Sequence, residues 1–322
     1  MQAICFDNSG LRFESHHADA TPGDQEVLVD VIQAGICETD LQLAQGYMGF
    51  SGILGHEFVG IATSGPLRGR RVVGEINCNC HACPRCEQGQ GNHCAHRSVL
   101  GILQHDGAFA QQIAVPQANL HEVPNSVSDD EAVFIEPLAA AMRIGQQIDL
   151  KAIRNAVLLG DGRLSYLCAQ AIGLEVRDVS VVGKHAMKLA RFQRLGYQSM
   201  LLDELRPEKQ FDLVVDCTGS VTGMPLALEL VKPCGTVVMK TTVAETHNTS
   251  LAAIVIDEIR VIGSRCGPFD LAIEALVEQR IDLGGLITHR FPLMDARDAF
   301  AVAVDPNAFK VVFQIAESAG DA

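Results

Sequence analysis

Two short polar stretches of the sequence carry residue types that bind metal ions. The first reads Gly35-Ile36-Cys37-Glu38-Thr39-Asp40 and the second reads Gly55-His56-Glu57. A thiolate and an imidazole, completed by a carboxylate or a water, are ligands that Zn²⁺ takes in proteins. Zinc held by three protein groups keeps one position open and can act as a Lewis acid on a bound oxygen. Considered singly, Cys37 is more typical of a buried small hydrophobic residue and His56 of a core histidine.

Four cysteines within residues 78–94 follow the pattern C-x2-C-x2-C-x7-C. They are Cys80, Cys83, Cys86 and Cys94. Thiolates this close in sequence can surround one zinc ion tetrahedrally at about 2.3 Å, which leaves no position for a substrate. The pattern therefore predicts a structural zinc site, with Cys78 and His81 as spare candidates. Disulfides or free thiols are the alternative.

A further candidate ligand lies in an apolar, alanine-rich segment. Residues 129–150 carry a helical pattern, and Glu136 stands within Ile135-Glu136-Pro137-Leu138. A carboxylate among apolar neighbours is costly unless it is paired or bound to a metal. Glu136 is thus a candidate third ligand of the open zinc site, or alternatively a solvated acid at the start of a helix.

Residues 155–174 combine a strand, a glycine turn and a helix. The apolar run 156–159 is followed by Gly160-Asp161-Gly162-Arg163-Leu164-Ser165 and then by a helical pattern. In this context the first glycine makes the turn, and the second lets the backbone approach a pyrophosphate at the helix N-terminus. The segment therefore predicts a dinucleotide site. Ser165 stands at the third position, which is normally Gly or Ala.

The alternation of strands and helices continues to about Gly263. Strands are predicted at 156–159, 179–183, 211–217 and 236–239, helices near 187–195 and 225–231, and a turn at 233–235. Such alternation predicts a doubly wound parallel sheet with ligands at the carboxyl ends of its strands. Thr218, at one such end, either contacts the cofactor or is only a turn residue.

The rest of the chain reads differently. Residues 1–75 predict short strands, including 26–32. Helices near 270–279 and 294–304 and a last strand at 310–313 are expected to return the chain to this first module.

The residues at the end of the second predicted strand of this sheet, 179–183, indicate which dinucleotide binds. An acidic residue about 20 positions past the glycine turn would bind the ribose 2′-hydroxyl of NAD. Here Gly183 is followed by Lys184 and His185, with Lys188 and Arg191 further on. No carboxylate in that stretch repels a 2′-phosphate and several cations could pair with one, which favours NADP over NAD. The alternative is an ordinary solvated helix face.

Composition narrows the class of protein. The chain has 322 residues, 48% of them hydrophobic, which is enough for two domains. Its formal net charge of −14 argues against a nucleic-acid or anionic-membrane partner. We find no apolar run near the ~20 residues that cross a bilayer and no signal-peptide pattern. Eleven cysteines in such a chain are more typical of metal ligands or free thiols than of disulfides, so we expect a cytoplasmic protein.

Taken in order, these motifs resemble the zinc-containing medium-chain alcohol dehydrogenase superfamily, especially its threonine, sorbitol and glucose dehydrogenase-like branch. The shared motifs are G-I-C-x-T-D, G-H-E, the four-cysteine lobe, E-P-L-A, the glycine turn and D-C-T-G, and they span nearly the whole chain. The resemblance implies an α/β fold with a Rossmann doubly wound parallel sheet domain at 133–263. It also implies a β-rich GroES-like catalytic domain at 1–132 with 264–322, and a homodimer or homotetramer.

The resemblance implies roles for the metal-binding residues. Cys37 and His56 match the ligands of the catalytic zinc. Glu57 resembles the family glutamate that can ligate zinc or exchange with water. Glu136 matches the E-P-L-A glutamate near the metal, where classical alcohol dehydrogenases place a cysteine.

Four further residues match family positions. Thr39 matches the hydroxyl that takes the proton from the substrate alcohol, and Asp40 resembles the neighbouring acid that orients a ligand or relay partner. Gln42 stands where the family often has a histidine that passes the proton to solvent. Lys188 falls where the family often has a basic residue that contacts the ribose or its phosphate.

The expected function is a zinc-dependent oxidoreductase that transfers a hydride between an alcohol or polyol, paired with its carbonyl, and NAD(P). A zinc-free quinone or enone reductase of the same superfamily is an alternative, although such enzymes usually lack both the cysteine lobe and the catalytic cysteine. A non-catalytic nucleotide- and zinc-binding relative is a second alternative, for which Ser165 and Gln42 are the only hints.

Overall fold

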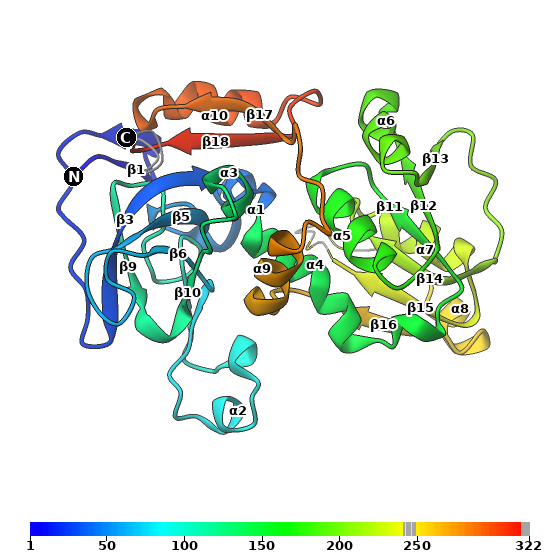
Figure 1. Ribbon diagram of the computed structural model, residues 1–322. Coiled ribbons are helices and arrows are strands. Elements are labelled where there is room, and N and C mark those ends of the chain that lie inside the picture. Colours follow the sequence, from blue (N-terminus) through cyan, green and yellow to red (C-terminus); the bar gives the residue numbers. More distant parts are fainter. Residues whose placement is uncertain (241, 243–245, 247–248, 317–322) are drawn as a thin grey trace. The chain divides into compact units, whose positions relative to one another are not determined.

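The computed structural model describes residues 1–240, 242, 246 and 249–316. The chain forms two compact units, one of Met1–Glu136 with Phe269–Ala322 and one of Pro137–Pro268 (Figure 1). Helix α4 (Ile135–Gln147) begins in the first unit and continues in the second.

The first unit contains a seven-stranded mixed sheet with the order β10-β6-β5-β3-β18-β17, in which β9 also pairs with β3. Its strands are β3 (Glu26–Gly35), β5 (Glu57–Ala62), β6 (Arg71–Gly74), β9 (Gln112–Pro116), β10 (Leu120–Glu122), β17 (Ile287–Phe291) and β18 (Lys310–Gln314). Two smaller sheets accompany it, with the orders β2-β1-β4 and β7-β8. Their strands are β1 (Ala3–Asp7), β2 (Gly10–Glu14), β4 (Gly52–Ile53), β7 (Asn77–Cys78) and β8 (Ser98–Val99).

Short helices connect these strands. They are α1 (Glu38–Leu43), η1 (Tyr47–Gly49), α2 (Pro84–Glu87), η2 (Gly91–His93), η3 (Gln117–Asn119), α3 (Asp129–Ala132), α9 (Phe269–Val277), η5 (Leu293–Asp295) and α10 (Ala296–Ala303). Figure 1 shows α2 in a lobe that stands apart from the main sheet of its own unit.

Strand β3 lies at the centre of this unit. Its first half alternates, with Val27, Val29 and Val31 buried, as expected for a strand with one covered face. From Val31 onward every residue is buried, because β3 pairs with β5 on one side and with β18 on the other. Strand β18, near the end of the chain, thus pairs with β3, and the red strand β18 lies beside the blue strand β3 (Figure 1).

An Arg71 side chain fastens α3 to the sheet. Its Nη1 donates to the Asp129 carboxylate at 2.8 Å, and its Nη2 donates to the carbonyl oxygens of Pro124 at 2.8 Å and Val127 at 2.7 Å. The side chains of Arg71 and Asp129 are 17% and 9% exposed, so water replaces these bonds poorly if one partner is lost.

We expect Arg71→Met to destabilise the protein by about 2–3 kcal/mol, because it leaves a nearly buried carboxylate and two carbonyls without their donor. The midpoint of thermal unfolding measures the effect. The neighbouring pair of Arg70 and Glu122 provides the control, since its side chains are 65% and 47% exposed and 3.6 Å apart. Arg70→Met should cost under about 1 kcal/mol. Equal shifts for the two variants would contradict the prediction.

The second unit holds a six-stranded sheet with the order β13-β12-β11-β14-β15-β16, and all of its strand pairs are parallel. Its strands are β11 (Asn155–Leu159), β12 (Asp178–Gly183), β13 (Gln198–Leu201), β14 (Phe211–Asp216), β15 (Val231–Met239) and β16 (Arg260–Gly263). Its helices, besides α4, are η4 (Leu150–Ala152), α5 (Arg163–Gly173), α6 (Ala186–Arg194), α7 (Gly223–Leu230) and α8 (Ala252–Ile256). Numbered from β11, this is the order 3-2-1-4-5-6, which confirms the predicted Rossmann sheet.

Two details of this unit differ from the predictions. The expected turn at 233–235 lies inside β15, which begins at Val231. Cys234 there has a φ of 62°, and its N–H donates to the Asp257 carbonyl at 2.7 Å, so the strand makes a local kink without ending. Edge strands β13 and β16 were not predicted, since they are mostly exposed and lack a continuous apolar run.

Within the described residues, none of the helices combines the length and the apolar character needed to cross a lipid bilayer.

Candidate metal centres and dinucleotide site

Cys37 and Asp40 lie where β3 passes into a short helix. Cys37 precedes α1, and the Asp40 Oδ2 accepts a hydrogen bond from the Cys37 N–H at 2.8 Å. Thr39 and Asp40 lie in α1, and this bond satisfies a backbone donor at the start of that helix.

The same carboxylate holds the second polar stretch. The Asp40 Oδ1 accepts the Gly55 N–H at 3.2 Å and lies 3.4 Å from the His56 Nδ1. Gly55 has a φ of 98°, and a Cβ there would lie 2.4 Å from the Phe109 ring, so only glycine fits. Asp40 is fully buried and therefore acts as the bridge between the two stretches.

Three metal-binding side chains converge at this bridge. Donor atoms of Cys37, His56 and Glu57 all lie within 4.8 Å of one another. Because the His56 Nδ1 faces Asp40, its Nε2 is the atom left for a metal, which is the usual arrangement of a ligating histidine. A thiolate, an imidazole and a carboxylate form a donor set that fits Zn²⁺.

Charge reinforces this convergence. Burial raises the pKa of Cys37, but the hydrogen bond and charge of His56 outweigh burial, so the net pKa is lowered. Burial lowers the pKa of His56, but the Asp40 carboxylate and the Cys37 sulfur together outweigh burial, so the net pKa is raised well above its ordinary value. Cys37 is thereby favoured as the thiolate, the form that binds metals.

Lys310, on β18, was missed by the sequence reasoning. Its side chain is 1% exposed and forms an ion pair with the Glu57 Oε2. Its Nζ also lies 3.4 Å from the Ile36 carbonyl oxygen, and burial lowers its pKa to about 8. A Cβ on Gly35 would lie 2.5 Å from the Lys310 Cε, so Gly35 leaves the room for this pair. A lysine in the apolar run 310–313 was the only signal in the sequence.

Glu136 and Thr39 are placed differently. Glu136 lies in the first turn of α4. Among the described residues, the group of donor atoms that lie within 4.8 Å of one another around Cys37 does not include its carboxylate. The Thr39 Oγ1 lies 4.0 Å from the Cys37 Sγ, so the hydroxyl borders the candidate metal position.

The four predicted cysteines converge in the α2 lobe. Sulfur atoms are 3.4 Å apart for Cys94 and Cys80, 3.6 Å for Cys83 and Cys86, and 3.8 Å for Cys83 and Cys94. A zinc tetrahedron with bonds of about 2.3 Å has sulfur–sulfur edges of about 3.8 Å, so the geometry fits a four-thiolate site. Cys78 and His81 are outside the group of described donors within 4.8 Å.

Backbone donors already favour thiolates in this lobe. Hydrogen bonds from the backbone at Ala95 and Cys86 lower the pKa of Cys83 to about 6. Backbone hydrogen bonds at Cys80 and His96 also lower the pKa of Cys94. Burial and the neighbouring thiols raise the pKa of Cys86 to about 12, as expected when negative sulfurs crowd together without a cation.

The predicted glycine turn links β11 to α5. Gly160 has a φ of 113°, and a Cβ there would lie 2.7 Å from the Cys217 carbonyl oxygen. Gly162 directly precedes α5, and Arg163 and Leu164 form the first turn of that helix. No described side chain caps the helix, so its N-terminal N–H groups fit a phosphate.

Asp161 occupies an unexpected place. Its Oδ2 accepts the N–H groups of Lys184 and His185, both at 2.7 Å, and lies 3.0 Å from the His185 Nδ1. A Cβ on Gly183 would lie 2.6 Å from Asp161, so this glycine admits the side chain. A carboxylate therefore stands at the end of β12, although it comes from the glycine turn and not from residues 183–191. Lys188 lies on the following helix, α6.

Thr218 follows β14 next to the glycine turn. Its Oγ1 donates to the Asp216 carboxylate at 2.7 Å and accepts the Ser220 N–H at 3.2 Å. The hydroxyl thus supports a turn at the carboxyl ends of β11 and β14, where the strand order of the sheet reverses. Ligands of such sheets bind at this point.

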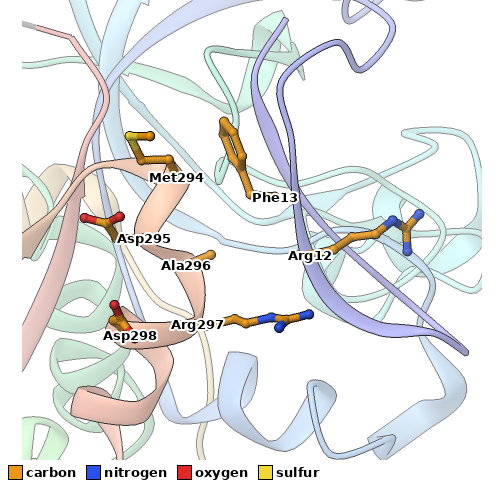
Figure 2. Close-up of a pocket in the computed structure, with 7 residues that line it drawn as sticks. All are labelled: Arg12, Phe13, Met294, Asp295, Ala296, Arg297 and Asp298. Carbon is orange, nitrogen blue, oxygen red and sulfur yellow. The ribbon is translucent and has the colours of Figure 1, made fainter.

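A surface hollow of the first unit contains none of these residues. It lies between β2 and the segment of η5 and α10 (Figure 2). Figure 2 shows Arg12 and Phe13 on the strand, and Met294, Asp295, Ala296, Arg297 and Asp298 on the neighbouring segment. Positive and negative side chains both line this hollow. Among the described residues, none that lines it belongs to a group of donor atoms that could hold a metal ion, so the hollow is not a second candidate for the metal site.

The known proteins that this chain resembles are dehydrogenases. Residues 23–125 match the alcohol dehydrogenase GroES-like domain family. The sorbitol dehydrogenase of Halalkalibacterium halodurans is 26% identical over 91% of this chain and 93% of its own length. The D-arabitol-phosphate dehydrogenase of Enterococcus avium is 28% identical over 90% of both chains.

A solved structure shares the fold. It is described as a zinc-binding dehydrogenase from Sinorhizobium meliloti 1021 bound to NADP, and it is 25% identical with a TM-score of 0.89. The similarity covers 97% of this chain and 98% of that one.

Proposed function

Because this chain belongs to the zinc-type medium-chain dehydrogenase/reductase superfamily, we propose that it is a zinc-dependent oxidoreductase acting on an alcohol or polyol and its carbonyl partner with NAD(P). The observation that carries the proposal is the convergence of Cys37, His56 and Glu57 around the buried Asp40. Three donors leave a zinc coordination position open for a substrate oxygen.

When bound, zinc would polarise an alcohol or carbonyl oxygen, and the nicotinamide would accept or give the hydride. The protein's own residues position the metal ligands and accept the substrate's proton. Asp40 fixes both ligand-bearing segments through the Cys37 and Gly55 N–H groups. Thr39, whose Oγ1 borders the Cys37 sulfur, accepts the proton that leaves the substrate hydroxyl. Lys310 holds Glu57 through their buried ion pair.

Two further residue sets complete the proposal. Cys80, Cys83, Cys86 and Cys94 hold a structural zinc. The turn Gly160–Leu164, the residues Gly183, Lys184, His185 and Lys188, and Thr218 bind the dinucleotide. A location in the cytoplasm, a dimeric or tetrameric state and a contribution of Glu136 to the catalytic zinc remain predictions from the sequence.

NADP is the favoured dinucleotide, because Lys184 and Lys188 offer cations for a 2′-phosphate. Asp161 opposes this preference, since its carboxylate lies at the Lys184 and His185 N–H groups. The balance of these charges sets the ratio of the two coenzymes.

We expect Asp161→Asn to raise the ratio of kcat/KM for NADP to that for NAD by about tenfold, or about 1.4 kcal/mol. Asparagine keeps one acceptor oxygen for the Lys184 N–H but removes the negative charge. Steady-state kinetics with both coenzymes measure the ratio. The matched variant Lys184→Gln should lower it, and an unchanged ratio in both variants would refute this account of selectivity.

Zinc analysis combined with turnover tests the function itself. The purified protein is assayed with NAD and NADP against short-chain, aromatic and polyol alcohols, and its zinc is measured by mass spectrometry. We expect turnover with at least one class of alcohol, and loss of that turnover when chelation removes the zinc. Turnover that persists after complete zinc removal would indicate a zinc-free reductase, and bound zinc without any turnover would indicate a non-catalytic relative.

A further inference from the structure

We propose that Cys5, Glu14 and His17 form a further Zn²⁺ site on the first hairpin of the chain. Donor atoms of these three side chains all lie within 4.8 Å of one another. None of the three belongs to the residues assigned above to the catalytic zinc, the cysteine lobe or the dinucleotide, so this site does not depend on the proposed function.

The hairpin brings the first two donors together. Strands β1 and β2 pair antiparallel, with Cys5 opposite Arg12 and Ala3 opposite Glu14. Cys5 and Glu14 are therefore diagonal neighbours on one face of the sheet, a spacing that side chains bridge. Cys5 is 5% exposed, and its sulfur lies within 4.8 Å of a Glu14 carboxylate oxygen.

His17 follows β2 and is turned towards this pair. Its Nδ1 lies 2.9 Å from the Ala18 carbonyl oxygen. A carbonyl oxygen only accepts, so Nδ1 carries the proton and Nε2 keeps a free lone pair. A histidine that donates one ring N–H to a backbone carbonyl and presents the other nitrogen has the tautomer that metal sites require. The His17 backbone is also fixed, since its carbonyl accepts the Met1 amino group at 2.7 Å.

The surrounding charges favour a cation. The Arg12 guanidinium is shared by two carboxylates, with its Nε 2.8 Å from the Glu14 Oε1 and its Nη1 2.6 Å from the Asp7 Oδ2. Asp106 adds a further negative charge that acts on Cys5. With Cys5 as a thiolate, the four negative charges of Cys5, Glu14, Asp7 and Asp106 exceed the single positive charge of Arg12, and a divalent ion would balance this excess.

A reactive thiol is the competing explanation for Cys5, and the structure disfavours it. Burial, together with Glu14 and Asp106, raises the pKa of this thiol to about 11 against the opposing effect of Arg12. Nucleophilic and redox-active cysteines have the opposite property, a lowered pKa and an exposed sulfur. One sulfur, one nitrogen and one carboxylate oxygen with a water in the fourth position suit Zn²⁺ rather than the oxygen-seeking Mg²⁺ or Ca²⁺.

The test measures zinc stoichiometry in the full-length protein. Wild type and variants are equilibrated at the same free Zn²⁺, buffered by a chromophoric chelator, and bound metal is measured by mass spectrometry. His17→Gln and Cys5→Ser should each bind one zinc ion fewer than wild type. His16→Gln, which changes an exposed neighbour, should bind as much as wild type.

Two readouts keep the outcome clear. In a Co²⁺-substituted sample, Cys5→Ser should lose part of the thiolate-to-metal absorption, whereas Cys234→Ser, at an exposed cysteine, should lose none. His17→Gln should keep the turnover of wild type, which separates this site from the catalytic one. Equal zinc content in wild type, His17→Gln and Cys5→Ser would overturn the proposal, whatever the fate of the proposed function.

Discussion

Replacement of Cys37 by alanine is expected to lower kcat/KM for alcohol oxidation by about 10³–10⁴-fold and to remove one zinc ion per chain. A metal acting as a Lewis acid contributes several kcal/mol to transition-state stabilisation, and each 1.36 kcal/mol corresponds to a factor of ten. Because Cys37, His56 and Glu57 are the three grouped donors, loss of the thiolate leaves two of them, which is too few for a stable site.

The fold should survive this change. Cys37 is held by its backbone N–H, which donates to Asp40 in the variant as in the wild type. Circular dichroism and the thermal midpoint should therefore match wild type closely, while mass spectrometry reports the lost zinc. Cys234→Ala, at an exposed cysteine, is the matched control and should retain both turnover and metal. Normal turnover or normal zinc content in Cys37→Ala would contradict the assignment.

Local sequence patterns predicted the parts of the site that lie close together in the chain. The cysteine spacing is one example, because Cys80, Cys83 and Cys86 need only two short turns to converge. The glycine turn is another, since Gly160 and Gly162 act within one strand–helix junction. The parallel sheet was predicted from the alternation of strands and helices, and its buried strands carry the continuous apolar runs that are typical of such sheets.

Features that depend on tertiary contacts could not be predicted in the same way. Asp161 was recognised as part of a turn, but its contact with the Lys184 N–H depends on how two strands are aligned. Edge strands β13 and β16 carry too few buried residues to show a period. Lys310 meets Glu57 across most of the length of the chain, through the pairing of β18 with β3 and of β3 with β5.

The ion pair between Lys310 and Glu57 was not predicted from the sequence, and its contribution to stability can be tested directly. In the zinc-free protein, we expect Lys310→Met to lower the stability by about 3–5 kcal/mol, because it leaves the Glu57 carboxylate buried without a counter-charge. Glu57 is 2% exposed, so water cannot replace the lysine. Thermal unfolding should show a fall in the midpoint on the order of 10 °C.

The double variant Lys310→Met with Glu57→Gln separates the pair from simple loss of packing. It removes both charges, so we expect it to recover most of the stability, since a neutral buried pair is often as stable as an ionic one. Lys209→Met is the surface control: its pair with Asp257 includes a lysine side chain that is 43% exposed, and its loss should cost under about 1 kcal/mol. If the double variant were no more stable than Lys310→Met, the cost would arise from the lost methylene packing. The buried carboxylate beside the candidate zinc would then be held by something other than Lys310.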